Sequence, residues 1–471
     1  MRVPLATNSY VSRSLPLSAQ RLVNFFPEIQ PPDAKSKLAL FGTPGLTELD
    51  DAGGSGPCRG IFVSVTTTYM VIADTLYSFT ANVLTSLGTI EGSGPVYFAE
   101  NNGGQIAICA PPRLYVLSAG VLSQVTDPDF PGAGSLDYMD GYGLFNAPDT
   151  GQFWITALNN FEDIDALDFV TAESAPDNIR RVLVDHREVW LFGDSTIELW
   201  VNTGAADFPF ERQSGAIMEK GIAAGNTANK LDNSVYWLGN DYVVYKADGY
   251  TPIRISTHAI EYAIENSETR DEAIAFSYEQ EGHAFYVLTL PPSEVTDYLG
   301  QTFVYDVASG LWHERQSGVT DAAWRVRYTV YDPVLQKYIA GDDRTGKIYE
   351  MSLDVYTENG ETILSYAVSP PIHADSKRAF MPWFQVEIES GVGLTTGQGS
   401  NPQMILQTSD DGGHTWSNER YAGMGAIGQY NYRARWRRLG KFRERYMRVG
   451  ISDPVKRVII AADTEITVAS S

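Results

Sequence analysis

Hydrophobic and polar residues alternate with a period of two along most of the chain, in short stretches rich in Val, Ile, Thr and aromatic residues. Gly, Pro, Asn and Asp separate these stretches. The pattern is typical of half-buried β-strands joined by turns. A helical period occurs at residues 257–266, with a second possible helical turn at 217–224. The sequence therefore predicts an all-β fold with very little helix.

The predicted strands recur as a unit that consists of an aromatic-rich strand, a short polar turn and a second strand. Successive units start at intervals of roughly 36 to 53 residues, which suits four-stranded blades better than leucine-rich or helical repeats. A closed ring of such sheets packs each sheet against two neighbours, so the sequence predicts a β-propeller. We expect about seven blades, with six as the alternative. The seven units start at residues 68, 104, 141, 187, 233, 283 and 336.

The two ends of the chain depart from this repeat. Residues 1–57 include a Pro-rich stretch at 24–46, which predicts an extended arm or a ring-closing segment. Residues 58–360 are assigned to the propeller. Residues 361–471 contain longer predicted strands and the motif described below, and they are assigned to a β-sandwich domain.

Composition and charge narrow the class of protein. Hydrophobic residues make up 43% of the chain and charged residues 20%, which is enough for a folded core. The net charge of −23 disfavours a protein that grips nucleic-acid phosphates over its whole face, but suits a wall past which DNA slides. Because no secretion signal or bilayer-spanning run is found, we expect a soluble protein made in a cytoplasm, without membrane insertion.

Metal and cofactor motifs are missing from the sequence. Cys58 and Cys109 lack a CxxC spacing, so we expect two buried thiols rather than a disulfide or a thiolate metal site. The six histidines are scattered, without an HExxH pair. No phosphate-binding Gly loop and no G-x-S-x-G motif occur. We expect no metal, no cofactor and no catalytic residue.

The segment SDDGGHTWS (409–417) matches an Asp-box, a turn found in sialidase-type glycosidases and in many β-proteins without catalytic activity. Its serine and aspartate can bond backbone amides, its glycines can take positive φ, and its tryptophan can pack beneath the turn. Each of these roles is structural, and none supplies an acid, a base or a nucleophile. The residues of the predicted structural turn are Ser409, Asp411, Gly413, Thr415 and Trp416.

A sialidase-like enzyme needs more than this motif. Such enzymes use three arginines and a tyrosine nucleophile, with an Arg-Ile-Pro motif and several Asp-boxes. This chain has one box and no Arg-Ile-Pro, so we expect no enzyme. A carbohydrate-active or carbohydrate-binding propeller stays open as the alternative, because of the Asp-box and because aromatic residues such as Trp154 and Trp312 look exposed in the sequence.

A basic segment stands out in this acidic chain. Between Arg433 and Arg448, eight Lys or Arg residues accompany a single acid, Glu444. Basic residues alternate with hydrophobic ones on both sides of a possible turn at 439–440, which predicts a hairpin with its arginines mainly on one face. The candidate interface residues are Arg433, Arg435, Arg437, Arg438, Lys441, Arg443, Arg445 and Arg448.

Three interpretations of this basic segment are open. The arginines could form a solvated face that pairs with local acids, or they could dock onto an acidic surface of a neighbouring copy or partner. Nucleic-acid binding is the third, and the charge of the remaining chain disfavours it.

The chain resembles a known family in three places. These are SAQRLVNFFPE (18–28) followed by KSKLALFGTPGL (35–46), the run of propeller-like repeats, and RRLGKFRERYMRVGISDPVKRVIIAADTEI (437–466). The family is that of the tail-hub or nozzle proteins of short-tailed bacteriophages (podoviruses), also called packaged-DNA stabilisation proteins. The resemblance covers both ends and the general organisation of the middle.

The resemblance implies a structural virion protein of the phage tail, assembled in the cytoplasm of the bacterial host, without catalytic residues. In that family a homohexameric ring lies below the portal and adaptor ring, extends the DNA channel and retains the packaged DNA. It also anchors tail spikes, fibres or a plug or needle protein. Genomic DNA would pass through without tight binding. A receptor-binding or baseplate protein of another tail type is a further alternative.

Overall fold

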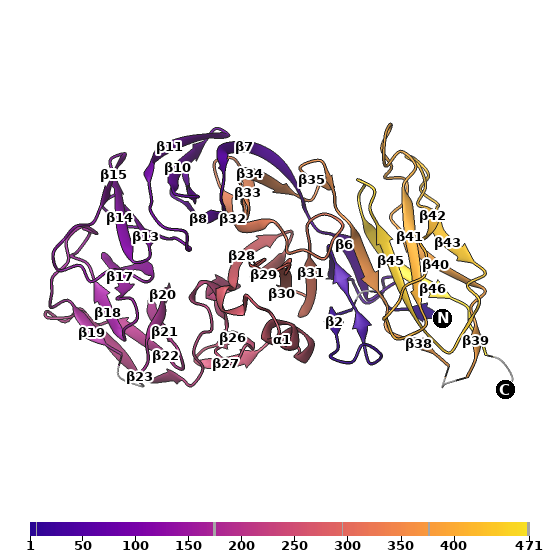
Figure 1. Cartoon of the computed structure of the whole chain (residues 1–471), viewed down its shortest axis with the longest axis horizontal. Coiled ribbons are helices and arrows are strands. Elements are labelled where there is room, and N and C mark those ends of the chain that lie inside the picture. Colours follow the sequence, from indigo (N-terminus) through magenta and orange to yellow (C-terminus); the bar gives the residue numbers. More distant parts are fainter. Residues whose placement is uncertain (6, 173–175, 294, 375–376, 469–471) are drawn as a thin grey trace.

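A computed structural model of the chain describes residues 1–5, 7–172, 176–293, 295–374 and 377–468. Figure 1 shows a ring of small sheets beside a second β-structure, which holds both ends of the chain. Among the described residues the only α-helix is α1 (His258–Glu265), with two short 3-10 turns, η1 (Gly225–Thr227) and η2 (Arg270–Glu272). The all-β prediction is confirmed.

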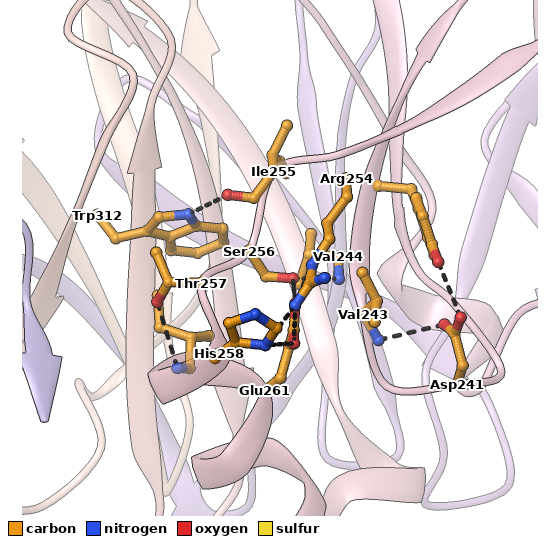
Figure 2. A network of polar contacts seen from close by, with 12 residues as sticks. Asp241, Val243, Val244, Arg254, Ile255, Ser256, Thr257, His258, Glu261 and Trp312 are labelled. Carbon is orange, nitrogen blue, oxygen red and sulfur yellow. Dashed lines mark hydrogen bonds and ion pairs between the residues drawn. The ribbon is translucent and has the colours of Figure 1, made fainter. Parts of the chain in front are cut away.

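Helix α1 lies where the helical period at 257–266 predicts it. Thr257 caps its first turn, since the Thr257 hydroxyl accepts a hydrogen bond from the Ile260 amide. Figure 2 shows how the preceding strand holds the helix: Arg254 donates from Nε to a carboxylate oxygen of Glu261 at 2.7 Å. The cap and this ion pair stabilise a helix that would be too short to persist alone.

The second predicted helical turn, at 217–224, is wrong. Strand β23 (Phe210–Met218) extends into this stretch, with Ala216 and Met218 buried and Ile217 between them exposed. The period at this point is therefore two, as in a strand. The stretch 217–224 contains too few hydrophobic residues for its spacing to distinguish a helix from the end of a strand.

Seven four-stranded antiparallel blades form the ring in the described part of the chain. Five of them are separate sheets, and the sixth and seventh are parts of larger sheets. The first three are β8 (Cys58–Val63), β9 (Thr68–Ile72), β10 (Thr75–Thr80) and β11 (Val83–Thr89); β12 (Tyr97–Glu100), β13 (Ile106–Ala110), β14 (Arg113–Ser118) and β15 (Val121–Gln124); and β16 (Leu136–Met139), β17 (Tyr142–Asn146), β18 (Gln152–Ile155) and β19 (Phe169–Thr171). The next three are β20 (Ile179–Asp185), β21 (Glu188–Gly193), β22 (Ile197–Asn202) and β23; β24 (Asn229–Leu231), β25 (Ser234–Leu238), β26 (Val244–Asp248) and β27 (Thr251–Arg254); and β28 (Ile274–Gln280), β29 (His283–Leu290), β30 (Gln301–Asp306) and β31 (Leu311–Arg315).

The seventh blade closes the ring with a strand from the start of the chain. It contains β32 (Val326–Asp332), β33 (Lys337–Asp342) and β34 (Thr345–Ser352), and the N-terminal β7 (Gly45–Ser55) pairs antiparallel with β34. Its first strand, β32, contacts β8 of the first blade. Two side-chain hydrogen bonds hold β7 in place. The Glu48 carboxylate accepts one from Lys347 and one from Asn359, each at 2.7 Å.

A separate hydrophobic cluster fills each of the seven interfaces between neighbouring blades in the described structure. At the closing interface Cys58 and Met70 of the first blade pack against Ile339 and Ile348 of the seventh. Each sheet thus buries both faces against its neighbours, which is the physical reason for the ring. The propeller prediction is confirmed with seven blades.

The second β-structure is a sandwich of two sheets. One contains β43 (Arg433–Arg437), β40 (Trp383–Ile388), β46 (Val458–Thr464), β6 (Leu38–Gly42) and β5 (Phe25–Ile29), with β1 (Arg2–Val3) on β46. The facing sheet contains β4 (Leu22–Val23), β37 (Ser365–Val368), β45 (Glu444–Ile451), β41 (Gln403–Ser409) and β42 (Arg420–Gly423), with β38 (Ile372–His373) on β45. Side chains such as Phe384, Trp436 and Met447 fill the core between them. The sandwich prediction is confirmed.

Short strands complete the fold. They are the pair β2 (Tyr10–Val11) and β3 (Ala19–Gln20); the sheet of β44 (Lys441–Phe442), β39 (Ala379–Phe380) and β47 (Thr467–Val468); and β35 (Thr357–Glu358) with β36 (Glu361–Thr362), which extends the seventh blade beyond β7.

The N-terminal strands join the propeller to the sandwich. β4 pairs in parallel with β31 of the sixth blade and antiparallel with β37, so one sheet runs from the blade into the sandwich. Two arginines are buried at this junction: Arg315 donates to the Pro44 carbonyl at 2.8 Å, and Arg457 donates to the Thr43 carbonyl at 3.0 Å. Burial lowers the pKa of Arg457 to about 10. The two domains therefore meet at a buried polar contact.

Candidate assembly surface

The basic segment predicted as one hairpin is divided between the two sheets of the sandwich. β43 pairs with β40 in one sheet, whereas β45 pairs with β37 and β41 in the other. Between them Arg438 (φ 58°) and Gly440 (φ 78°) turn the chain across the core. The hairpin prediction is therefore wrong. Trp436 on β43 and Met447 on β45 enter the same core from opposite sides, so the two strands face each other instead of pairing.

The alternation within β43 is as predicted. Ala434 and Trp436 point into the core, and the residues between them are exposed. The Arg435 guanidinium lies over the ring of Trp383 on β40, with Cζ 4.5 Å from the ring centre, which orients the charge without neutralising it. The exposed side chains of β43 are Arg433, Arg435 and Arg437.

Three more predicted residues of this segment, Arg438, Lys441 and Arg443, are also exposed. None of the six basic side chains forms an ion pair with a described residue. The interpretation that local acids neutralise these arginines therefore finds no support in the described structure. We call the following group the basic surface: Arg433, Arg435, Arg437, Arg438, Lys441 and Arg443.

Arg445 and Arg448 do not belong to this surface, contrary to the prediction. Arg445 is buried, and its Nε and Nη2 each donate to an oxygen of Asp410 at 2.6 Å. The Arg448 guanidinium lies over the ring of Tyr366, with Cζ 3.9 Å from the ring centre. Arg445 thus contacts the residue beside the Asp-box serine, and the Arg448 guanidinium also lies near Trp416 of the same turn, with Cζ 5.9 Å from the ring centre. They stabilise the domain rather than present charge.

The Asp-box forms the turn between β41 and β42. Ser409 donates from its hydroxyl to Asp411 at 2.7 Å and accepts from the Gly413 amide at 2.9 Å. Asp411 accepts from the Thr415 amide at 2.9 Å and from the Thr415 hydroxyl at 2.5 Å. These hydrogen bonds hold the pKa of Asp411 well below its usual range.

The same turn packs against the N-terminal segment. Gly413 has φ 90°, and a Cβ there would lie 2.5 Å from Cβ of Ala19, so only glycine fits. Trp416 packs onto the cluster that contains Ala19, Tyr366 and Tyr446. All five motif residues are used to build and seat the turn.

The two tryptophans that suggested a carbohydrate surface are buried. The Trp312 indole donates to the Ile255 carbonyl at 2.8 Å, as Figure 2 shows. The Trp154 ring stacks on Phe169, with 4.6 Å between ring centres. The expectation that Trp154 and Trp312 are exposed is wrong, because each lies in a contact between strands or blades that the local sequence does not reveal.

Further chemistry is sparse in the described part of the chain. No group of three or more His, Cys, Asp or Glu side chains there is arranged to hold a metal ion. None of the described helices has the length and hydropathy needed to span a membrane.

Sequence reasoning missed three exposed tyrosines near the basic surface, Tyr421, Tyr430 and Tyr432. Tyr430 is 78% exposed, and Tyr432 directly precedes β43. The stretch QYNY (429–432) immediately before the basic segment was the available signal. Exposed tyrosines beside arginines are typical of protein interfaces.

Comparison with known proteins agrees with this architecture. A family model described as "Bacteriophage P22 Gp10, beta-propeller" matches residues 1–356, and one described as "Bacteriophage P22 Gp10, beta-sandwich" matches residues 367–467. The chain belongs to the bacteriophage P22 Gp10 family. This Gp10-family protein is 22% identical over 429 residues to the tail hub protein gp10 of Salmonella phage P22, with 86% of each chain covered. The resemblance to tail-hub proteins is confirmed.

Two solved structures are similar to the chain at low scores. PorZ, a surface component of the type-IX secretion system of Porphyromonas gingivalis, has a TM-score of 0.38 and 12% identity; the match covers 81% of the Gp10-family protein but 46% of the PorZ chain. A chain of the mitotic checkpoint complex has a TM-score of 0.38 and 8% identity, covering 64% and 94% of the two chains. No functional statement rests on these likenesses.

Proposed function

We propose that the protein is the tail hub of a short-tailed phage virion, and that it works by geometry rather than by catalysis. The observation that carries the proposal is the match of both domains, in the same order, to the propeller and sandwich of the Gp10 family. Its relative in Salmonella phage P22 is a tail hub protein. In this proposal copies of the chain form a homohexameric ring below the portal and adaptor ring.

The charge of the chain supports a channel role. With a net charge of −23, the protein repels phosphate over most of its surface, so genomic DNA passes without contacts that would stall it. A closed propeller resists deformation, because each blade is packed on both sides. The ring thus extends the DNA channel, retains the packaged genome and offers a platform for spikes, fibres or a plug or needle protein. It is assembled in the bacterial cytoplasm.

We also propose that the protein has no glycosidase activity. The Asp-box side chains are engaged in their own turn, and the buried Trp154 and Trp312 offer no sugar platform. Pure protein should release no product from a panel of fluorogenic sialosides and other glycosides. Turnover that survives repurification would contradict this part of the proposal.

The hub role is tested on phage particles that lack this protein. Such particles should lose their packaged DNA, and adding the purified protein should restore retention. Electron microscopy of complete particles should place the protein in a closed ring with an axial channel. Full DNA retention without the protein would overturn the proposal, and a location on a baseplate would favour the receptor-binding or baseplate alternative.

A further inference from the structure

Arg315 and Arg457 are buried at the junction of the two domains, and both leave part of their hydrogen-bonding capacity unused. Each residue is 2% exposed. Nη2 of each donates to a backbone carbonyl, whereas Nε and Nη1 of both have no hydrogen-bond partner among the described residues. A buried N–H group without a partner is costly, and native proteins leave few of them. These four nitrogens therefore indicate a ligand that the chain itself does not supply.

The two guanidinium groups lie close together. They donate to the carbonyls of consecutive residues, Pro44 and Thr43, in the segment that leads from β6 of the sandwich into β7 of the propeller. Burial and the charge of Arg315 lower the pKa of Arg457. Arg315 ends β31 of the sixth blade, and Arg457 directly precedes β46 of the sandwich. Each domain thus contributes one buried cation to the place where the ring meets the sandwich (Figure 1).

Acidic side chains do not compensate these two charges. Neither arginine forms an ion pair with a described residue. Burial lowers the pKa of Arg315, against the opposing influence of Tyr278 and Glu358. Glu358 accepts at Oε1 from the Trp324 indole at 2.9 Å, and burial raises its pKa. Even when it is ionised, this one carboxylate leaves a positive charge uncompensated.

Arg59 shows how the fold treats a buried arginine whose donors the chain itself satisfies. It is 1% exposed and donates to three carbonyls, those of Ala73, Ile90 and Gly94, at 2.7 to 2.9 Å. No nitrogen of Arg59 is buried without a partner in the described structure. Backbone carbonyls therefore suffice for Arg59, whereas they leave both arginines of the junction incompletely bonded.

The packing around the two arginines suits a small ligand. A Cβ at Gly42 of β6 would lie 2.7 Å from Arg457 Nε, and φ of Gly42 lies outside the left-handed region, so glycine is needed here for space rather than for backbone freedom. The Trp324 ring covers one face of the Arg315 guanidinium, with Cζ 3.3 Å from the ring centre, and leaves its N–H groups pointing outward in the plane. Because both groups are closely packed, chloride suits the site better than phosphate or sulfate.

We propose that Arg315 and Arg457 bind a chloride ion that bridges the two domains at their junction. The ion supplies the missing negative charge and accepts charge-assisted hydrogen bonds from both guanidinium groups. It holds the sandwich in a fixed orientation to the propeller, because each domain contributes one of the two arginines. This site goes beyond the proposed tail-hub function and does not depend on it.

The dependence of stability on the anion tests the site in full-length protein. Thermal unfolding is measured at constant ionic strength while sodium gluconate is replaced by sodium chloride or sodium bromide. A ligand that binds only the folded chain raises the Tm in a saturable way, and we expect a rise of about 2 °C or more by about 150 mM chloride. Crystals soaked in bromide should show an anomalous scattering peak within hydrogen-bonding distance of both guanidinium groups. A Tm that is equal in gluconate and chloride, or crystals without this peak, would overturn the proposal.

Arg457→Met separates the bridging ion from a general effect of salt. The variant should lose the response to chloride, and in gluconate it should be at least as stable as the wild type, because an uncompensated buried charge is gone. Arg59→Met is the matched control at an equally buried arginine, and it should lower the Tm in both salts but keep the response to chloride. A full chloride response in the Arg457 variant would contradict the site. If that variant does not fold, the bromide peak in the wild type decides alone.

Discussion

Arg445 and Asp410 form a two-pronged ion pair that ties the Asp-box turn to β45, with both N–O distances at 2.6 Å. The guanidinium is buried, whereas the Asp410 side chain is 47% exposed. A third nitrogen of Arg445 donates to the Leu439 carbonyl at 2.6 Å. One arginine thus connects the Asp-box turn with the chain crossing between the two sheets.

Replacing Asp410 by alanine should destabilise the sandwich, because it leaves a buried cation without its counter-charge. Loss of one partner of a buried pair costs about 3 to 5 kcal/mol, and partial exposure of Asp410 reduces this to about 2 kcal/mol. Urea unfolding followed by tryptophan fluorescence measures the change. Asp33→Ala, at an exposed position, serves as control and should shift the free energy of unfolding by less than about 0.5 kcal/mol. Equal effects of the two substitutions would contradict the role of the pair.

The Asp-box should contribute stability that is lost in acid. The pKa of Asp411 is lower in the folded chain than in the unfolded one, so its contribution is fully present above the unfolded value of about 4. It declines as pH falls below that value toward the folded pKa. Compared with Asp411→Asn, the wild type should have the higher Tm at pH 7, and the difference should shrink below about pH 4. A difference that does not change with pH would contradict the assignment.

Both thiols should be unreactive in the folded protein. Cys58 and Cys109 are buried, and burial raises the pKa of each to about 12. At pH 8 the reactive thiolate is then about one part in ten thousand. A disulfide reagent such as DTNB should label neither thiol in native protein and both after unfolding in guanidinium. Rapid labelling of folded protein would contradict the packing of these blades.

The ring closure should depend on Leu46 of β7. Leu46 is buried against Met351 of β34 and the core between the sixth and seventh blades. Leu46→Ala should cost about 3 kcal/mol and speed amide hydrogen exchange in β34. Val83→Ala, on the exposed outer strand of the first blade, is the matched control and should leave exchange unchanged. Unaltered exchange in β34 of the Leu46 variant would show that β7 does not hold the ring.

The sequence predicted the propeller well because most of each blade has a strong local signal. The second strand of a blade, such as β13 with all five residues buried, is an unbroken hydrophobic run. The first strand is short and mixed: β12 has one buried residue among four. The predicted units therefore begin at the second strand of each blade. The number of repeated units therefore gave the number of blades, although the sequence did not predict the first strand of each blade.

The errors arose where partners are distant in the sequence. Period two correctly predicted which residues of β43 are buried, but it failed in β45, where Arg445, Tyr446 and Met447 are buried in succession. Periodicity also does not tell which strand lies alongside. Val23 pairs opposite Glu314, and Leu40 opposite Ile459, so the partners of the N-terminal strands have no local signal. For the same reason Arg445 looked like a surface arginine, since Asp410 lies on another element.

The pairing of the chain's first residues with β46 sets an order on synthesis. The Met1 amino group donates to the Thr464 carbonyl, 463 positions away. At about 5 to 20 residues per second, the ribosome makes that partner roughly 20 to 90 s after the first residues emerge. Strand β7 likewise has no partner until β34 has been synthesised. A nascent chain thus cannot close the propeller before translation has passed residue 352, and cannot complete the sandwich before it has passed residue 464.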